Sequence, residues 1–121
     1  MSIVECVPNF SEGRNTTAID QIAQAISGVD GVVLLDVDPG QATNRTVVTF
    51  VGEPDAVSEA AFRAIKTAGE VLDMRTHEGE HARMGATDVC PFVPVSGITM
   101  EACAELARKL GKRVGDELGI P

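Results

Sequence analysis

Both histidines of the chain lie in one polar, glycine-punctuated stretch, residues 75–88, which reads RTHEGEHARMGATD. Histidine is the side chain whose ordinary pKa lies near neutrality, so His77 or His81 could transfer a proton at physiological pH. The alternative interpretation is a pair of exposed loop histidines without a role. The pattern favours a proton-transfer site in this stretch.

The same two histidines match the pattern H-E-x-x-H, which binds zinc in metalloproteases. That motif needs a continuous helix, which places both imidazoles on one face and positions the glutamate as a base. Here Gly79 interrupts the motif, no apolar periodicity continues through residues 82–85, and no third ligand stands out downstream. A zinc hydrolase using His77, Glu78 and His81 therefore remains the less favoured alternative, and we expect no metal.

Three further polar clusters stand between apolar runs, where turns are expected. They are residues 9–14 (NFSEGR), 36–38 (DVD) and 43–45 (TNR). Each could consist of ordinary turn residues, since Asn, Asp, Ser and Gly all favour turns. Arg14, Arg45 and Arg83 are more informative, because a guanidinium group matches the geometry of a carboxylate. In a mostly acidic chain, these bases predict an anionic substrate at the polar loops.

Hydrophobic patterning predicts seven elements in the order β-α-β-β-α-β-α. The strands are expected over 3–7, 32–37, 45–51 and 86–95, and the helices over 15–28, 54–72 and 99–118. The first six elements form the split βαβ arrangement of an α+β, ferredoxin-like βαββαβ sandwich, in which one antiparallel sheet carries two helices on one face. The seventh is an amphipathic C-terminal helix, which must also bury its apolar stripe.

Several local features carry more detailed predictions. Pro8 and Asn9 are expected to end the first strand in a loop, and residues 38–40 (DPG) are expected to form a turn. Pro91 and Pro94 indicate an edge position or bulges in the fourth strand. The buried stripe of the last helix is expected to be Met100, Cys103, Ala107, Leu110, Val114 and Leu118.

Composition excludes several classes of protein. The chain has 121 residues, the commonest size of a single domain. Its formal net charge of −8 would repel the phosphate backbone of a nucleic acid, so nucleic-acid binding is not expected. It has no Trp or Tyr for stacking bases. No apolar run approaches the ~18 residues of a membrane span, and no secretory signal opens the chain. Three cysteines without a CxxC pair favour reduced thiols in the cytoplasm.

Five spaced motifs together resemble the N-terminal subdomain of the glutamate formiminotransferase family, and the likeness is collinear over essentially all of residues 1–121. The motifs are residues 4–14 (VECVPNFSEGR), 34–38 (LLDVD), 44–47 (NRTV), 49–52 (TFVG) and 80–92 (EHARMGATDVCPF). Five motifs of this length are far more specific than the single H-E-x-x-H match.

The resemblance implies transfer of a formimino group from N-formimino-L-glutamate to the co-substrate tetrahydrofolate, in histidine degradation and one-carbon metabolism. The catalytic histidine of the family falls on His81, which would act as general acid and base without a metal or a covalent intermediate. The residues expected to bind substrate are Asn9, Arg14, Asp38, Asn44, Arg45, Arg83, Met84 and Gly85. Residues that bind a resident cofactor are not assigned.

Two departures from the family pattern qualify this expectation. Ala82 stands where the family usually has a proline after the catalytic histidine. Family enzymes also continue past the equivalent of residue 121 and pair this subdomain with a second one, so the chain is expected to be truncated and weakly active alone. We expect a homo-oligomer, or a C-terminal subdomain or partner chain that completes the site. The alternative function is a non-catalytic module of the same fold that binds folate or a partner.

Overall fold

The computed structural model describes residues 2–11, 15–40, 42, 45–71 and 87–119 of the chain. Strands and helices follow one another in the predicted order, except that the predicted strand over 86–95 is divided in two and a short additional strand follows the first. The strands are β1 (Ile3–Cys6), β2 (Asn9–Phe10), β3 (Val32–Gly40), β4 (Arg45–Gly52), β5 (Thr87–Val89) and β6 (Phe92–Ser96); the helices are α1 (Thr16–Ser27), α2 (Pro54–Val71) and α4 (Met100–Leu118).

The strands form one antiparallel sheet. β4 lies between β3 on one side and β1 with β2 on the other, and β1 and β2 keep one register against β4. β6 pairs with β1, and β5 pairs with β2. β5 and β6 therefore lie end to end along one border of the sheet. This order, with every described pairing antiparallel, confirms the predicted ferredoxin-like arrangement.

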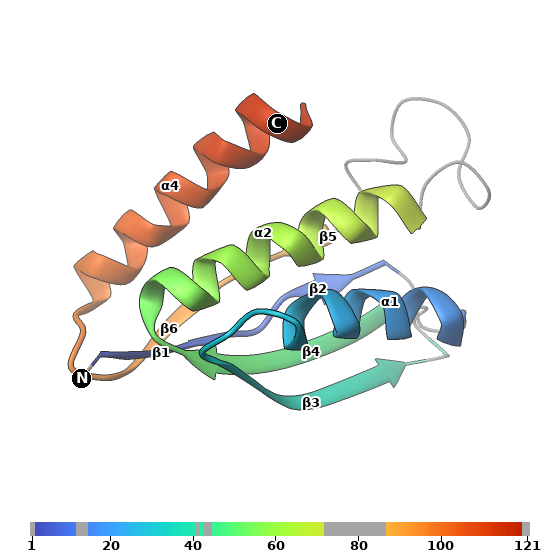
Figure 1. Ribbon diagram of the computed structural model, residues 1–121, viewed down its shortest axis with the longest axis horizontal. Helices are drawn as coiled ribbons and strands as arrows, with labels where there is room; N and C mark the ends of the chain where they lie inside the picture. Colours follow the sequence, from blue (N-terminus) through green and yellow to red (C-terminus); the bar gives the residue numbers. More distant parts are fainter. Residues whose placement is uncertain (1, 12–14, 41, 43–44, 72–86, 120–121) are drawn as a thin grey trace.

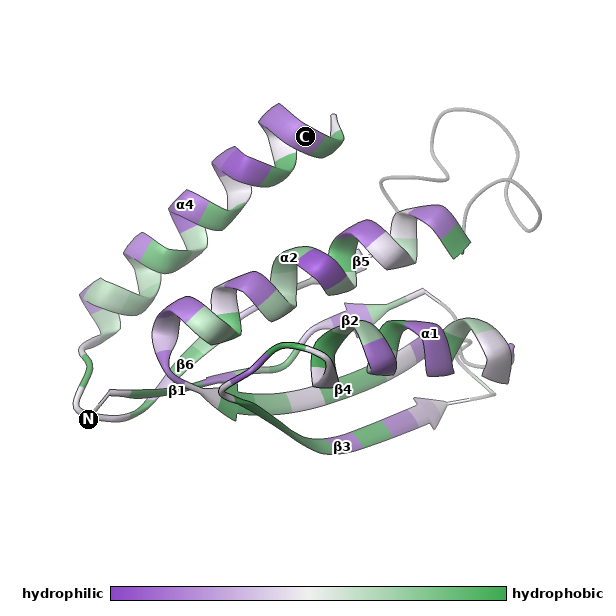
Figure 2. Cartoon of the chain, viewed as in Figure 1, coloured by the Kyte–Doolittle hydropathy of each residue, from purple (hydrophilic) through white to green (hydrophobic). Residues whose placement is uncertain are grey.

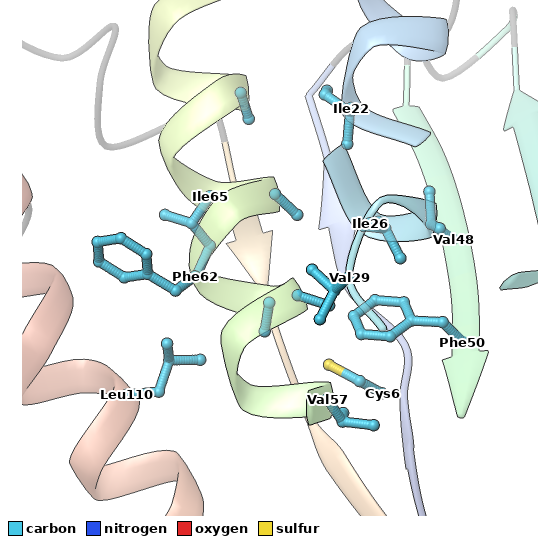
Figure 3. Packing of buried hydrophobic residues seen from close by; sticks show 14 of the residues in the cluster. Cys6, Ile22, Ile26, Val29, Val48, Phe50, Val57, Phe62, Ile65 and Leu110 are labelled. Atoms are coloured by element: carbon cyan, nitrogen blue, oxygen red, sulfur yellow. The ribbon is translucent and has the colours of Figure 1, made fainter. Parts of the chain in front are cut away.

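The helices cover one face of the sheet (Figure 1). α1 packs beside α2, and α4 packs against α2 and β6, so α4 extends the helical layer. The core lies between this layer and the sheet, where Phe50 of β4 and Cys6 of β1 meet Val57 of α2 (Figure 3). None of the helices in the described ranges is long and apolar enough to cross a membrane.

Side-chain caps begin two of the helices where the sequence predicts them. Asn15 Oδ1 accepts a hydrogen bond from the Ala18 amide at 3.1 Å at the start of α1. Thr99 Oγ1 accepts one from the Ala102 amide at 3.1 Å at the start of α4. Each bond satisfies an amide that has no partner inside its helix, which fixes where the helix begins.

Two predicted loops are strand instead. Asn9 and Phe10 form β2, and β3 continues through Asp38, Pro39 and Gly40, which pair with residues 45–47 of β4. Proline cannot donate a hydrogen bond, but β3 borders the sheet on one side, so Pro39 costs no ladder bond there. The turn between β3 and β4 therefore begins later than predicted.

The predicted strand over 86–95 is divided into β5 and β6 at Cys90 and Pro91, and residue 86 lies outside the described ranges. Facing this break, Val7 and Pro8 separate β1 from β2. The ladder between β1 and β6 also shifts register between Ile3 and Val4, opposite Pro94. The predicted edge position and bulge are both confirmed. The physical reason is that proline lacks the amide hydrogen that a continuous ladder requires.

The buried stripe of α4 is shifted from its predicted composition. Cys103, Leu110 and Val114 are buried as expected, but Met100 is 70% exposed and Ala107 is also exposed. Leu106 takes the place of Ala107 against the core. Figure 2 shows the resulting alternation of hydrophilic and hydrophobic bands along the helix. Helical spacing allowed either residue, and the position of α2 decided between them.

Candidate functional site

Strand pairing brings two of the predicted binding residues into one row. Asn9 of β2 and Asp38 of β3 both face Val47 of β4, from opposite sides of that strand. Because neighbouring strands lie about 4.8 Å apart, the two backbones are about 10 Å apart in this row. A ligand that lies across β4 could therefore contact both side chains.

The row lies on the face of the sheet that the helices leave open. Side chains alternate between the two faces of a strand. Phe10, next to Asn9, is 1% exposed and belongs to the helix-covered core, so Asn9 projects to the other face. Val37, next to Asp38, also packs against the core, while Asp38 is exposed. Both predicted binding residues are thus available to a ligand from the open face.

Arg45 lies at the beginning of β4, opposite Gly40 and two residues from Val47. Its side chain is exposed and belongs to the same open face as Val47. Asp36 and Asp38 of β3 are exposed nearby along the strand. This corner of the sheet combines carboxylates with a guanidinium group, a mixture suited to a ligand that carries both acidic groups and N–H donors.

The other predicted site residues fall in segments outside the described residues. They are Arg14, Asn44, His81, Arg83, Met84 and Gly85, together with the alternative zinc ligands His77 and Glu78. The described chain resumes at Thr87 in β5, which pairs with the strand of Asn9. Val89, within the motif of residues 80–92, thus pairs with Asn9 of the open-face row.

No group of three or more His, Cys, Asp and Glu side chains within the described ranges is placed to hold a metal ion. The histidine pair itself falls outside those ranges. The described carboxylates of the open face alone do not form a cation site.

One described groove lies at the opposite end of the sheet from Arg45. It has a volume of about 510 Å³ and lies between the beginnings of α2 and α4, where Pro54, Ile98 and Leu106 contribute to its wall. None of the predicted site residues lines it. The groove is therefore separate from the candidate site.

Two features were not identified from the sequence. Exposed aliphatic side chains flank the polar row: Val33 and Leu35 on β3, and Val93 and Val95 on β6. The run of four aliphatic residues at 32–35 was a possible signal, since a strand buried on one face only should alternate. The second feature is the contact between Cys6 and Cys90, whose sulfur atoms are 3.5 Å apart.

Comparison with known proteins gives one consistent result. Residues 3–121 match the model of the formiminotransferase domain, N-terminal subdomain. The formimidoyltransferase-cyclodeaminase of Rattus norvegicus is 58% identical over 119 residues, which are 98% of this chain and 22% of the relative. The glutamate formimidoyltransferase of Thermoplasma acidophilum is 55% identical over 121 residues, all of this chain and 40% of the relative.

A glutamate formimidoyltransferase of Streptococcus pyogenes is 50% identical over 119 residues, 98% of this chain and 40% of the relative. The chain therefore spans between about a fifth and two fifths of the length of these relatives. A match over nearly every residue, at these identities, leaves no ambiguity about its relationship. The chain belongs to the formiminotransferase family and corresponds to the N-terminal subdomain of its transferase domain.

Proposed function

We propose that this chain is the N-terminal part of a glutamate formimidoyltransferase, which transfers the formimino group of N-formimino-L-glutamate to tetrahydrofolate. The observation that carries the proposal is the open-face row of Asn9 and Asp38, in which Asn9 pairs with Val89 of β5, a strand within the same 80–92 motif as His81. Two relatives that match 100% and 98% of the chain are named for this activity.

His81 is proposed as the proton carrier of the reaction. A nitrogen of tetrahydrofolate attacks the formimino carbon and loses a proton, and the nitrogen of glutamate must gain one as its bond to that carbon breaks. One imidazole can accept the first proton and donate the second, because its ordinary pKa lies near neutrality. The step therefore balances without a metal or a covalent intermediate.

The remaining predicted residues are proposed to bind the two substrates. Both substrates carry carboxylates, which the arginine side chains can bind through paired N–H groups. The Asp38 carboxylate can accept hydrogen bonds from amidine and amide N–H groups, and the Asn9 side-chain amide can both accept and donate them. The proposed set is Asn9, Arg14, Asp38, Asn44, Arg45, Arg83, Met84 and Gly85.

The open face is proposed to be completed by further polypeptide, either a C-terminal subdomain or a partner chain. The matched region is 40% and 22% of the length of two of these relatives, so they contain ample further chain for this role. Aliphatic side chains such as Leu35, which is 55% exposed, suit such a contact. A homo-oligomer, a cytoplasmic location and a role in histidine degradation and one-carbon metabolism are part of the same proposal.

The test is a transfer assay on the purified protein that contains this chain, with tetrahydrofolate as acceptor and glutamate release as the readout. Transfer that depends on both substrates is the expected result. Binding of tetrahydrofolate without any transfer, in a preparation with the C-terminal part supplied, would instead identify a non-catalytic binding module. Activity that disappears in chelator and returns with zinc would favour the hydrolase alternative.

A further inference from the structure

Two of the three cysteines meet where the paired strands are interrupted. Cys6 is the last residue of β1, and Cys90 lies between β5 and β6. Their Sγ atoms are 3.5 Å apart, although the residues are separated by 84 positions in the sequence. A disulfide bond is about 2.05 Å long, so the two sulfur atoms need to approach by about 1.5 Å to be joined.

The two thiols differ in access to solvent. Cys6 is 0% exposed and lies in the core between Phe50 and Val57 (Figure 3). Cys90 is only half-buried, so it is the more accessible of the two residues. The hydrogen bond to Cys90, together with burial, raises the pKa of the Cys6 thiol well above its usual range. Cys6 therefore stays protonated and is shielded from solvent, next to Cys90.

The backbone around the pair is less tightly held than a regular ladder. Pro8 and Pro91 both lie within the break, and neither has an amide hydrogen to donate. The described bonds in this gap are Val7 N–H to the Pro91 carbonyl at 3.2 Å and Val48 N–H to the Pro8 carbonyl at 3.1 Å. The chain can therefore adjust here without breaking the ladders on either side.

We propose that Cys6 and Cys90 are a reversible redox site, which a small disulfide such as oxidised glutathione converts to an intrachain disulfide. The Cys90 sulfur attacks the small disulfide, forms a mixed disulfide and releases one reduced glutathione. The Cys6 thiol then gives up its proton to water and attacks the Cys90 sulfur as a thiolate, and the second departing glutathione thiolate takes up a proton from water. Two protein thiols and one glutathione disulfide thus give one protein disulfide and two glutathione thiols.

This bond would join the end of β1 to the residue that follows β5. It would hold β5 against β2, the strand of Asn9, and would constrain the unfolded chain between the two cysteines. The proposal concerns the thiols themselves and does not depend on the transferase activity. Its test can therefore fail while the proposed function stands, and the reverse also holds.

The first experiment incubates the purified native protein with oxidised glutathione, quenches with acid, and measures intact mass and disulfide-linked peptides. We expect a product two hydrogens lighter in which Cys6 is linked to Cys90 and Cys103 stays free. Dithiothreitol should restore the starting mass. Cys103 is 3% exposed on α4, so Cys103→Ala should react like the unaltered protein and serves as the control.

Two variants test the proposed order of events. In Cys6→Ala the second thiol is missing, so one glutathionyl group should accumulate on Cys90. In Cys90→Ser neither the adduct nor the disulfide should form, and this half-buried position tolerates the change better than the core position. Circular dichroism checks that each variant is folded.

The unaltered protein alone can overturn the proposal, whatever the variants do. A stable adduct that remains on Cys90, a bond that includes Cys103, or three free thiols after prolonged incubation would each show that the contact between Cys6 and Cys90 is a packing contact only.

Discussion

The two faces of β4 are built from alternate residues of one strand, yet their environments differ completely. Thr46, Val48 and Phe50 are at most 1% exposed beneath the helices. Val47 and Thr49, between them, are half-buried on the face that no described helix covers. One strand thus contributes both to the core and to the candidate site.

The difference separates stability from chemistry along a single strand. Substitutions on the helix-covered face remove packing, whose loss lowers the free energy of unfolding. On the proposed function, substitutions on the open face would remove ligand contacts and leave that packing in place. The open-face residues should therefore affect binding or rate, and the core residues should affect folding.

The largest expected effect is on catalysis, from His81→Ala. Loss of a general acid and base lowers kcat by about 10²- to 10⁴-fold. The measurement is steady-state transfer by the active protein that contains this chain, with His77→Ala as the matched control, for which a much smaller loss is expected. Near-normal turnover of the His81 variant would remove this residue from the mechanism.

The sharpest test of the comparison between the two faces substitutes neighbouring residues of β4. Phe50→Ala should lower the free energy of unfolding by about 3–5 kcal/mol, because it leaves a cavity in the core. Thr49→Ala, on the open face, should change it by less than about 1 kcal/mol. Urea denaturation measures both. Equal losses would mean that the open face is covered and packed like the core.

A smaller effect is expected on substrate binding. Arg45→Gln should raise KM for N-formimino-L-glutamate by about tenfold, equivalent to about 1.4 kcal/mol, because it removes a charged donor to a carboxylate. Asp38→Asn should also raise KM while changing the free energy of unfolding by less than about 0.5 kcal/mol. Arg108→Gln, exposed on α4, is the charge-matched control, and a KM change as large in this variant would indicate a general charge effect.

The smallest expected effect concerns the contact between α2 and α4, away from both faces. Arg113 donates to Glu59 at 2.7 Å and stacks on the Phe62 ring at 3.6 Å. This hydrogen bond, and a second from Arg63, hold the pKa of Glu59 below its ordinary 4.5. The stabilisation by the carboxylate is therefore complete above pH 4.5 and is lost as the pH falls through the lowered pKa.

Glu59→Gln should accordingly be less stable than the unaltered protein at pH 7, by at most about 1 kcal/mol, since the pair is partly exposed. The difference should shrink as the pH falls below 4.5. Glu70→Gln, exposed on the same helix, is the control. Urea denaturation across this pH range measures the effect, and a difference that grows toward acid pH would contradict the assigned sign.

Much of the fold could be predicted because its signals are local. Hydrophobic patterning placed α1, α2 and β4 close to their observed ranges, and the caps Asn15 and Thr99 set where two helices begin. The errors lie where neighbouring elements determine the local structure. β2 is a strand because β4 and β5 flank it. Leu106 rather than Ala107 packs against the core because of the position of α2.

The candidate site shows the same division. The sequence alone determined which residues can transfer a proton or bind a carboxylate, and its motifs identified the family, because residue type and spacing are properties of the chain. Only the tertiary structure decided that Asn9 and Asp38 share one row, since that depends on which strands pair and in which register. It also decided that Cys6 meets Cys90, because proline breaks in two paired strands coincide only once the strands are side by side.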